Sequence, residues 1–517
     1  MSFKEHLVNL VLSFRPFPAV TSAATLAAAP GDGGGEDRLS ALPDDLRRNI
    51  VSRLPITDAV RTTALSTGWR GIWRSAPLVL YDQHIPGATA PEHVAAINSV
   101  LASHPGPIPI RTAHLVAFDF KPHEPELAEW SPILASRDVE DLVLITRPMM
   151  RMFEKLTLPA DILRCKKLRR LQLGFWAFPD TTNLPGGLGG FPDLQELAIL
   201  CTHIADSDLD RMLDSSPALE KLALATSFEV PERVRLRGEK LERAIFCASR
   251  VVEIAVEAAP CLERLVMWDM IPSEPPGAGV RIAGAAPALK VLGYLDTRVH
   301  QLRFGDNSAV ITVQADTNPS PRSRVPSVKI LLPLPHNISI SIKVDFNVFS
   351  QVRMLLSFLR CFPNVETLHV ESAVPDDEST EDQNAEFFEN LGPIECVRFH
   401  ITKVFLYGLR GCQSEMALLK YLALRAIQLQ KLTLVLPYEN LGSDGENGNG
   451  NNIIAQLHDL LQPEWASEAC KVLLQRPVSR LICSFDKAFY LSIQDPFLKE
   501  DGEVLFYYMK MREHDVN

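Results

Sequence analysis

Residues 194–224 read LQELAILCTHIADSDLDRMLDSSPALEKLAL, and this stretch decides the fold of most of the chain. It begins and ends with one phrase: an apolar residue, two variable residues, an apolar residue, one variable residue and another apolar residue. The last apolar positions alternate with variable ones, which predicts a short strand with one buried face. Between the phrases, Leu209, Met212 and Leu213 share a helical face after a cap at Asp206 or Ser207. The stretch therefore predicts a strand–helix–strand unit.

The same phrase recurs along the chain. It reads VEDLVL (139–144), LRRLQL (168–173), LQELAI (194–199), LEKLAL (219–224), LERAIF (241–246), LERLVM (262–267), LKVLGY (289–294), VETLHV (365–370) and LQKLTL (429–434). Up to 289 its starts differ by 29, 26, 25, 22, 21 and 27 residues, within the roughly 20–29 of leucine-rich repeats. IECVRF at 394–399, 29 residues after 365, is predicted as a further strand. An α/β solenoid with a parallel, horseshoe-shaped sheet on its concave side is expected over 110–372.

The period weakens towards the C-terminus. Between 295 and 362, VHQLRF and SVKILLP are predicted as degenerate strands, and FSQVRMLLSFLRCFP (349–363) as a helix. From 391 to 475, strand-like CVRFHITKVFLYGL and helix-like SEMALLKYLALRAIQL predict a compact α+β cap on the solenoid. The polar stretches 374–387 and 440–452 are predicted loops, and 476–517 is left as a C-terminal extension.

A different pattern occupies 37–77, DRLSALPDDLRRNIVSRLPITDAVRTTALSTGWRGIWRSAP. Pro43 suits the first turn of a helix that Pro55 ends, and Thr57 can cap the next helix. Trp69 and Trp73, four residues apart, are predicted on one face of a third helix. Three short helices make a very small core, so this unit is expected to complete its burial against a neighbour or a partner. Residues 1–36 are predicted to be a poorly ordered leader.

Composition narrows the function classes. A net charge of −11, from 52 basic and 63 acidic residues, argues against a general nucleic-acid binder, which needs a basic face. Nine cysteines without a CxxC pair predict buried, reduced thiols and a reducing compartment. No stretch reaches the ~20 apolar residues of a membrane span. No zinc motif, phosphate loop or G-x-S-x-G elbow occurs, so no catalytic site, metal or cofactor is expected.

The segment 37–77 resembles the F-box of plant F-box proteins along its whole length, through its Leu-Pro-x-Asp opening, its second Leu-Pro, DAVRTTALS and the WR..W ending. We place this domain at 37–80. The phrases SPALEKL, APCLERL and APALKVLGYL are similar to the leucine-rich region of the F-box/LRR proteins of grasses, and 391–475 is similar to the FBD module of many of them. Gly68 departs from the pattern, because the family usually has a basic residue there. Glycine costs about 1 kcal/mol in a helix, so adaptor affinity could be weakened.

The resemblance implies a non-catalytic receptor in a Skp–cullin–F-box (SCF) ubiquitin ligase. Its F-box would dock on a Skp-type adaptor, and through it a cullin, while the repeats hold a target protein for ubiquitin transfer. In the alternative interpretation, Leu46, Ile50, Leu65 and Trp69 only fill the helical core. By motif position, the residues that form the F-box fold and its adaptor surface are Leu42, Pro43, Leu46, Leu54, Pro55, Val60, Leu65, Trp69 and Trp73.

Target binding is less determined by the sequence. Variable residues beside the strand leucines point to the concave face of a solenoid, and their mixed charges indicate no particular ligand. Trp268 stands out because tryptophan often anchors interfaces, although half-buried packing explains it equally well. The candidate substrate-binding residues on this face are Gln172, Glu196, Lys221, Arg264, Trp268, His369, Glu371 and Lys431.

Other functions remain open at this point. The chain could be an interaction scaffold that no longer engages a ligase, or a hormone-like small-molecule receptor, which requires a deep pocket lined by repeat loops. An extracellular receptor is a further alternative, because LVNLVLSF with its Ala-rich continuation faintly resembles a signal peptide. However, Glu5, Arg15 and two prolines interrupt that pattern. An intracellular protein, nuclear or cytoplasmic, is therefore expected.

Overall fold

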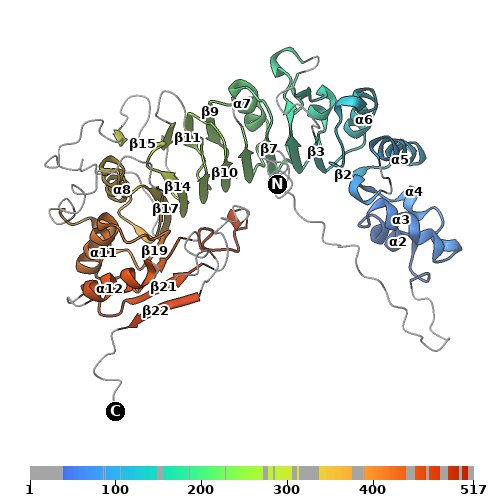
Figure 1. Ribbon diagram of the computed structural model, residues 1–517. Helices are drawn as coiled ribbons and strands as arrows, with labels where there is room; N and C mark the ends of the chain where they lie inside the picture. The colour runs from blue at the N-terminus through green and yellow to red at the C-terminus, as the bar shows by residue number, and fades with distance from the viewer. Residues whose placement is uncertain are drawn as a thin grey trace, which may run out of the picture. The chain divides into compact units, whose positions relative to one another are not determined.

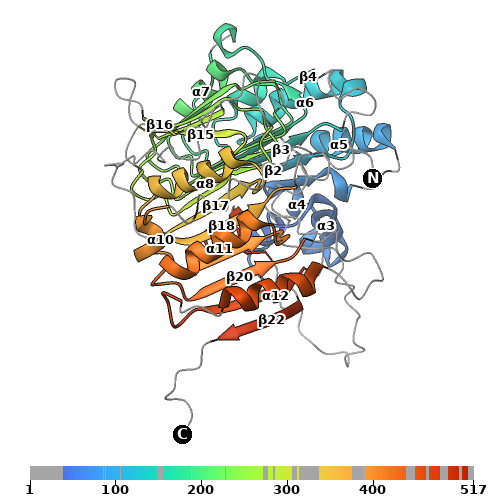
Figure 2. The same ribbon diagram turned by 60° about the vertical axis from the view of Figure 1, so that its left-hand side comes forward.

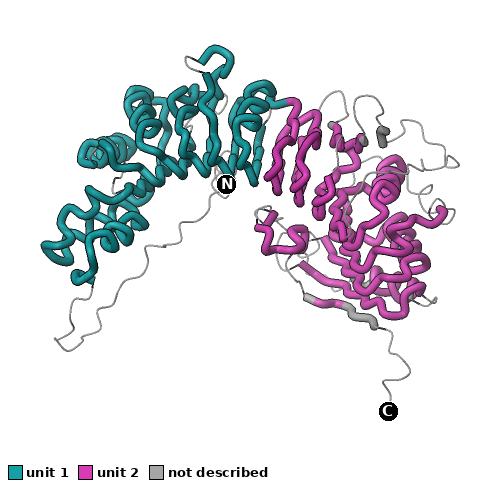
Figure 3. Tube along the Cα trace, turned by 180° about the vertical axis from the view of Figure 1, so that it is seen from behind, with its two compact units in different colours: residues 1–231 teal, residues 232–517 magenta. Residues whose placement is uncertain are grey.

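The computed structural model describes residues 39–85, 87, 89–104, 106–147, 155–184, 187–227, 229–271, 278–282, 286–304, 311–313, 337–374, 388, 391–437, 449–461, 465–477, 487–488, 490–499 and 503–509. The chain divides into two compact units, 1–231 and 232–517 (Figure 3). The predicted leader, 1–36, lies outside the described residues.

Three short helices open unit 1 (Figure 1). Helix α2 (Asp44–Val51) starts directly after Pro43, and its two aspartates lie in the first turn, at the positive end of the helix. Helix α3 (Ile56–Arg61) starts after Pro55, so Thr57 lies inside the helix and is not its cap as predicted.

The third predicted helix is divided in two. The 3₁₀ turn η2 (Thr67–Trp69) carries the first tryptophan, and α4 (Ile72–Ser75) carries Trp73. Gly71 between them has a φ of +80°, a left-handed conformation that glycine adopts without steric cost. The prediction of one continuous helix is therefore wrong, because the chain turns at Gly71.

These helices, with the turns between them, form the N-terminal bundle (residues 44–75). Its core is small and centres on Trp69, which is 2% exposed. Trp69 Nε1 donates a hydrogen bond to Ser40 Oγ at 3.1 Å, which holds the preceding turn against the ring. Leu54 and Trp73 are half-buried and pack on the edge of this core. The remaining core members are Val51, Ala59, Ile72 and Ala76.

The bundle continues into the repeats without a linker, through contacts that we call the joint. Only Ala76 and Pro77 separate α4 from strand β1 (Leu78–Tyr81), which pairs in parallel with β2 (Ile110–Leu115). Trp73 stacks on His104 with ring centroids 6.4 Å apart, and His104 Nε2 lies 2.9 Å from the Ala76 carbonyl oxygen. Arg137 then donates to the backbone carbonyl of His104 at 3.3 Å. The joint therefore fixes the bundle to the first repeats of unit 1.

The repeats of unit 1 build a parallel sheet, as the leucine spacing predicts. The pairing runs from β2 through β3 (Asp141–Ile145), β5 (Arg170–Gly174), β7 (Glu196–Leu200) and β8 (Lys221–Ala225). Helices α5 (Ala90–Ser103), α6 (Glu124–Ser136) and α7 (Asp206–Asp214) lie in the connections, and β4 (Leu156–Thr157) pairs with β6 (Trp176–Ala177). The register aligns one buried leucine per strand: Leu142, Leu171, Leu197 and Leu222.

Helix α7 confirms the helical face predicted from Leu209, Met212 and Leu213, which are all buried. Its N-cap is Ala205 and not the predicted Asp206 or Ser207. The residue that follows β5, β7 and β8 has a φ of 66° at Phe175, 47° at Cys201 and 56° at Thr226. None of these is glycine, which is uncommon for a left-handed position, so this recurring turn escaped the sequence analysis.

Unit 2 contains a second long run of parallel strands. Its order is β10 (Arg243–Cys247), β12 (Arg264–Trp268), β14 (Val291–Asp296), β17 (Ile338–Val344), β18 (Val365–Ser372), β19 (Lys403–Tyr407), β20 (Lys431–Val435) and β21 (Lys471–Arg476). Strand β22 (Glu503–Met509) ends the sheet in antiparallel pairing with β21. Helices α8 (Phe349–Cys361), α10 (Glu395–Phe399), α11 (Gln413–Arg425) and α12 (Asn449–Leu461) lie along it (Figure 2).

The predicted cap, 391–475, has the expected mixture of helices and strands. Its strands β19, β20 and β21 pair in parallel, and β19 pairs with β18, so the cap prolongs the sheet. IECVRF (394–399) is not a strand as predicted, because Glu395–Phe399 forms α10. The connection between parallel strands β18 and β19 requires a crossover, which α10 supplies. Helix α12 also begins at Asn449, inside the predicted loop 440–452.

Early in unit 2 a second sheet replaces the expected helices. It comprises β9 (Arg233–Arg237), β11 (Glu253–Ala258), β13 (Ala278–Ile282), β15 (His300–Phe304) and the antiparallel β16 (Ile311–Val313). In RVRLR the valine and leucine are buried while the first arginines face outward, the alternation of a half-buried strand. VHQLRF therefore contains a strand, as predicted, but in this second sheet. SVKILLP lies outside the described residues.

Candidate partner-binding surfaces

Exposed apolar side chains gather on the N-terminal bundle and the turn before it. Leu46 (51% exposed) and Ile50 (37%) lie four residues apart on α2, and Val60 (40%) ends on α3. Leu65 (58%) follows Ala64 of the 3₁₀ turn η1 (Thr62–Ala64). Leu39 (55%) precedes Ser40, whose hydroxyl lies 3.0 Å from that of Ser66. We call these five side chains the bundle surface. Contiguous exposed apolar area of this kind marks sites of protein contact.

The bundle separates the predicted adaptor residues into two groups. Leu46, Ile50 and Leu65 are exposed, so they do not fill the helical core, whereas Trp69 is a core residue. Adaptor contact by the exposed residues stays a prediction. Of the nine candidates, Pro43, Leu46, Val60 and Leu65 are exposed, Leu42, Leu54 and Trp73 half-buried, and Pro55 and Trp69 buried. For Pro55 and Trp69, a role in an adaptor surface is corrected to one in the fold.

Gly68 does not interrupt a helix, because it lies in the short turn η2. The helix-propensity cost considered for this glycine therefore does not arise. Its carbonyl oxygen accepts a hydrogen bond from Arg47 Nη1 at 2.6 Å, and the Arg47 guanidinium lies 5.9 Å from the centroid of the Trp69 ring. A Cβ at position 68 would meet only the mobile end of Arg47, at 2.5 Å. Gly68 thus leaves the bundle surface intact.

The repeats of unit 1 carry a ladder of alternating charges across their strands. Arg170 Nη1 donates to Asp141 Oδ2 at 2.7 Å, and Arg170 Nε donates to Glu196 Oε2 at 2.9 Å. Lys221 Nζ pairs with the other oxygen of Glu196, and His114 Nε2 lies 3.4 Å from Asp141 Oδ1. Burial raises the pKa of Asp141, but His114 and Arg170 outweigh it and hold that pKa below its ordinary value. The ladder therefore neutralises its own charges.

Replacing Arg170 with Met should destabilise unit 1 by about 2 kcal/mol at pH 7, between the values for surface and buried ion pairs. Urea unfolding of the full chain would measure this loss. The pKa values of Asp141 and Glu196 are depressed in the fold, so their contribution is present above the ordinary carboxylate pKa and lost as the pH falls through the depressed values. The difference between wild type and variant should therefore shrink below about pH 4.

Lys290→Met is a suitable control for Arg170→Met. Lys290 Nζ binds Glu263 Oε1 at 3.0 Å in an exposed pair, and such pairs contribute about 0.5 kcal/mol. An Arg170→Met variant that is no less stable than Lys290→Met would show that the ladder has no structural role.

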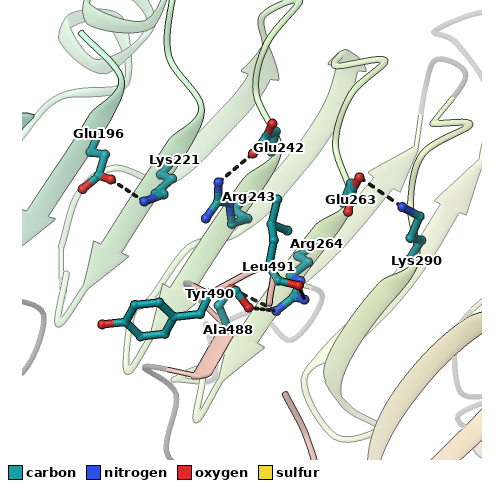
Figure 4. A network of polar contacts seen from close by, with 10 residues as sticks. All are labelled: Glu196, Lys221, Glu242, Arg243, Glu263, Arg264, Lys290, Ala488, Tyr490 and Leu491. Carbon is teal, nitrogen blue, oxygen red and sulfur yellow. Dashed lines mark hydrogen bonds and ion pairs between the residues drawn. The ribbon is translucent and has the colours of Figure 1, made fainter. Parts of the chain in front are cut away.

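In unit 2, residues 487–488 and 490–499, which we call the strap, lie against main-sheet strands far away in sequence. Arg264 of β12 donates to the carbonyl oxygens of Tyr490 at 3.0 Å, Leu491 at 3.3 Å and Ile493 at 2.5 Å, with Lys487 and Ala488 at 3.5 Å (Figure 4). Arg264 is only 3% exposed. A buried guanidinium is thus satisfied by backbone alone.

The far end of the strap is held by β18 and β19. His369 Nε2 lies 2.9 Å from Asp495 Oδ2, and Lys499 Nζ lies 3.2 Å from Glu371 Oε2. The Lys499 ammonium also lies 4.4 Å from the centroid of the Tyr407 ring. Burial raises the pKa of Asp495, but His369 outweighs it, so that the pKa lies below its ordinary value. The strap is therefore anchored at both ends by charged groups.

The predicted concave-face residues differ in what they can offer a target. Gln172, Arg264 and His369 are buried, and the strap contacts the last two. Trp268 packs at the edge of an apolar cluster that includes Phe497, so half-buried packing describes it. The remaining candidates, Glu196, Lys221, Glu371 and Lys431, are half-buried. Target binding by any of them stays a prediction, and the strap itself was missed.

Two hollows bear on the small-molecule alternative. One of about 580 Å³ lies in unit 2 beside α11 and α12, and its lining includes Met416, Leu424 and Leu460. It belongs to the predicted cap and not to the repeat loops. The other, of about 460 Å³, lies in unit 1 among loops that carry His84 and Arg147, and it is the more open of the two. An open hollow in the repeat loops counts against a buried hormone site.

Side chains for catalysis or metal binding were also sought. Among the residues that the structure describes, no three His, Cys, Asp or Glu side chains gather as metal ligands. In the same ranges, no helix has the length and apolarity to cross a bilayer. The eight described cysteines are free thiols, and burial raises the pKa of Cys165 and Cys361 to about 12, which leaves these thiols protonated and inert. Cys483 lies outside the described residues.

Family comparisons match three parts of the chain. A family model described as F-box domain matches residues 39–81. A second, described as FBD-associated F-box protein At5g56370, LRR repeats, matches 127–370, and a third, FBD, matches 389–434. The order is the one that the sequence analysis predicted.

Relatives in Arabidopsis thaliana show the same combination of domains. The F-box/LRR-repeat protein At3g26922 is 28% identical over 46% of this chain and 69% of the relative. The F-box/FBD/LRR-repeat protein At1g13570 is 28% identical over 37% of this chain, which spans 45% of that relative's length. The putative F-box/FBD/LRR-repeat protein At5g56810 is 23% identical over 85% of this chain and 97% of the relative.

Proposed function

We propose, from the premise that this chain is a plant F-box/LRR protein with a C-terminal FBD module, that it is the substrate-recognition subunit of an SCF ubiquitin ligase. The observation that carries the proposal is the bundle surface. Leu46 and Leu65 are more than half exposed, although they belong to a bundle that buries few apolar residues of its own. A polypeptide that covers this surface would supply the burial that the bundle lacks.

In this role the chain has no catalytic step to perform. The bundle surface binds a Skp-type adaptor, the adaptor binds a cullin, and a separate enzyme transfers ubiquitin to a target held by the repeats. The buried thiols of Cys165 and Cys361, protonated at neutral pH, are unsuited to a ubiquitin thioester. We also propose that the protein works inside the cell, in the nucleus or the cytoplasm, where its adaptor would be.

Calorimetric titration of the full chain with a plant Skp-type adaptor tests the proposal. We expect a complex of one chain with one adaptor at micromolar or tighter affinity, and recruitment of a cullin by that complex. The double variant Leu42→Ala/Pro43→Ala should weaken it, because both residues precede α2 at the edge of the bundle surface. Absence of any complex at micromolar concentrations would overturn the proposal in favour of a scaffold without a ligase.

A further inference from the structure

The sheet face beneath the strap is apolar at its centre. Along β12, Leu265 and Met267 point into the solenoid core, so Arg264, Val266 and Trp268 point to the opposite face. On that face Val266 pairs in register with Ile245 of β10. Both pack against Phe497 and Ala488 of the strap in one buried cluster with Val291 and Tyr294. Without the strap, an apolar floor would face solvent.

Polar anchors surround this floor, and they read two different features of the strap. Arg264 contacts only main-chain carbonyl oxygens, so it recognises the path of the backbone and no particular side chain. Asp495, Phe497 and Lys499 are instead recognised as side chains. His369 receives the aspartate, and the Phe497 ring meets Tyr294 edge-on with centroids 5.0 Å apart. Glu371 and Tyr407 then receive the lysine.

These contacts have the composition of a peptide-binding site. A buried arginine, aromatic rings and an apolar centre within a polar rim are the features that carry affinity at protein interfaces. The three side chains that are recognised stand at every second position, as they do when an extended segment presents one edge to a receptor. The face therefore selects an acidic residue, an aromatic residue and a basic residue at that spacing.

We propose that this face is the target site of unit 2, and that the strap is a resident ligand which a target segment of the same chemistry displaces. The partner is a polypeptide with the pattern acid-x-aromatic-x-base. The inference rests on the proposed function, since it specifies which surface holds the target. Arg264 and His369, which the sequence placed on a target-binding face, are then the residues that bind whichever segment is present.

Tethering sets how strongly the strap competes. A segment joined to its own site by a short connection acts at an effective concentration on the order of 1 mM. If the uncovered face binds the free segment with a Kd of about 10 μM, the resident strap weakens binding of an added peptide by on the order of 100-fold. A target must therefore bind better than the strap does.

The test uses a fluorescent peptide of residues 490–499, YLSIQDPFLK, and the full chain without adaptor. The variant Asp495→Ala/Phe497→Ala should release the strap and bind the peptide about 100-fold more tightly than wild type. Adding Arg264→Met should abolish binding, because the new side chain cannot donate to carbonyls. The matched peptide YLSIQAPALK should bind neither protein. Equal affinity for wild type and the released variant, or no binding to a released variant that remains folded, would overturn the inference.

Hydrogen exchange of the unaltered chain gives a second measurement that needs no variant. Saturating YLSIQDPFLK should accelerate exchange of the strap amides at 490–499 and leave those of β20 unchanged. Unaltered exchange in millimolar peptide would refute displacement even if the released variant failed to fold. Because no adaptor is present, these results and those of the adaptor titration can fail independently of one another.

Discussion

Replacing Leu46 with Lys should lower the affinity for a Skp-type adaptor by at least about 100-fold. Burial of a leucine side chain contributes about 2 kcal/mol, and an ammonium group in its place would have to lose water without gaining a partner, at a cost of several kcal/mol. Together these terms exceed the 2.7 kcal/mol or so that separates affinities 100-fold apart. Calorimetric titration of the purified variant with the adaptor would measure the loss.

The stability of the chain should not change in this variant. Leu46 is 51% exposed, so a lysine there keeps its charge in water while the protein is free. Leu424→Lys provides the matched control, because Leu424 is 47% exposed on α11, outside the bundle. That control should bind the adaptor like wild type. Adaptor binding by Leu46→Lys within threefold of wild type would exclude the bundle surface as the docking site.

Trp69→Ala should unfold the bundle, with a loss of about 4 kcal/mol, typical for truncation of a buried tryptophan. The substitution empties the centre of the bundle core and removes the donor to Ser40 Oγ and the ring against which Arg47 lies. A unit with so small a core cannot absorb that loss. Hydrogen exchange across 44–75 would register it as loss of protection in α2, α3 and α4.

The two variants differ in the reason for which adaptor binding fails. In Leu46→Lys the bundle stays folded and protected, while in Trp69→Ala it does not. Trp69→Phe, which keeps most of the apolar volume, should lose about 1–2 kcal/mol and retain a folded bundle. A Trp69→Ala variant that kept full protection in α2 would contradict the role of this ring as the centre of the core.

The parallel sheets were predictable because one physical constraint repeats. Leu171, Leu197 and Leu222 occupy the same position in successive phrases, and the register stacks them as the spacing requires. The helices at 206–214 and 349–361 followed in the same way from their apolar faces. In these segments the local pattern and the long-range packing agree, so the pattern was sufficient.

The errors arise where one pattern fits two structures. IECVRF has its first apolar residues three positions apart, a spacing that suits a helical turn as well as the start of a repeat strand. The need for a crossover between β18 and β19 decides for α10. RVRLR in β9 has the alternation of a strand, and its assignment was missed because helices were expected in every connection.

The candidate binding residues were predictable only in part. Leu46 and Leu65 could be named from their motif, but their exposure depends on how α2 and α3 pack. Arg264 was placed correctly beside a strand leucine. Its partners at 490–493, however, lie more than 200 residues further along the chain, and backbone carbonyls leave no mark in a sequence. The strap could therefore be found only in three dimensions.

The joint has a consequence for the chemistry that the ligase would direct. Because β1 follows α4 after only Ala76 and Pro77, and Trp73 and Arg137 both engage His104, the adaptor and the first repeats would move as one rigid arm. A client gripped by unit 1 would then present the same few lysines to the charged conjugating enzyme at every encounter. Stiffness at this elbow would limit which lysines are modified, separately from how tightly the client is held.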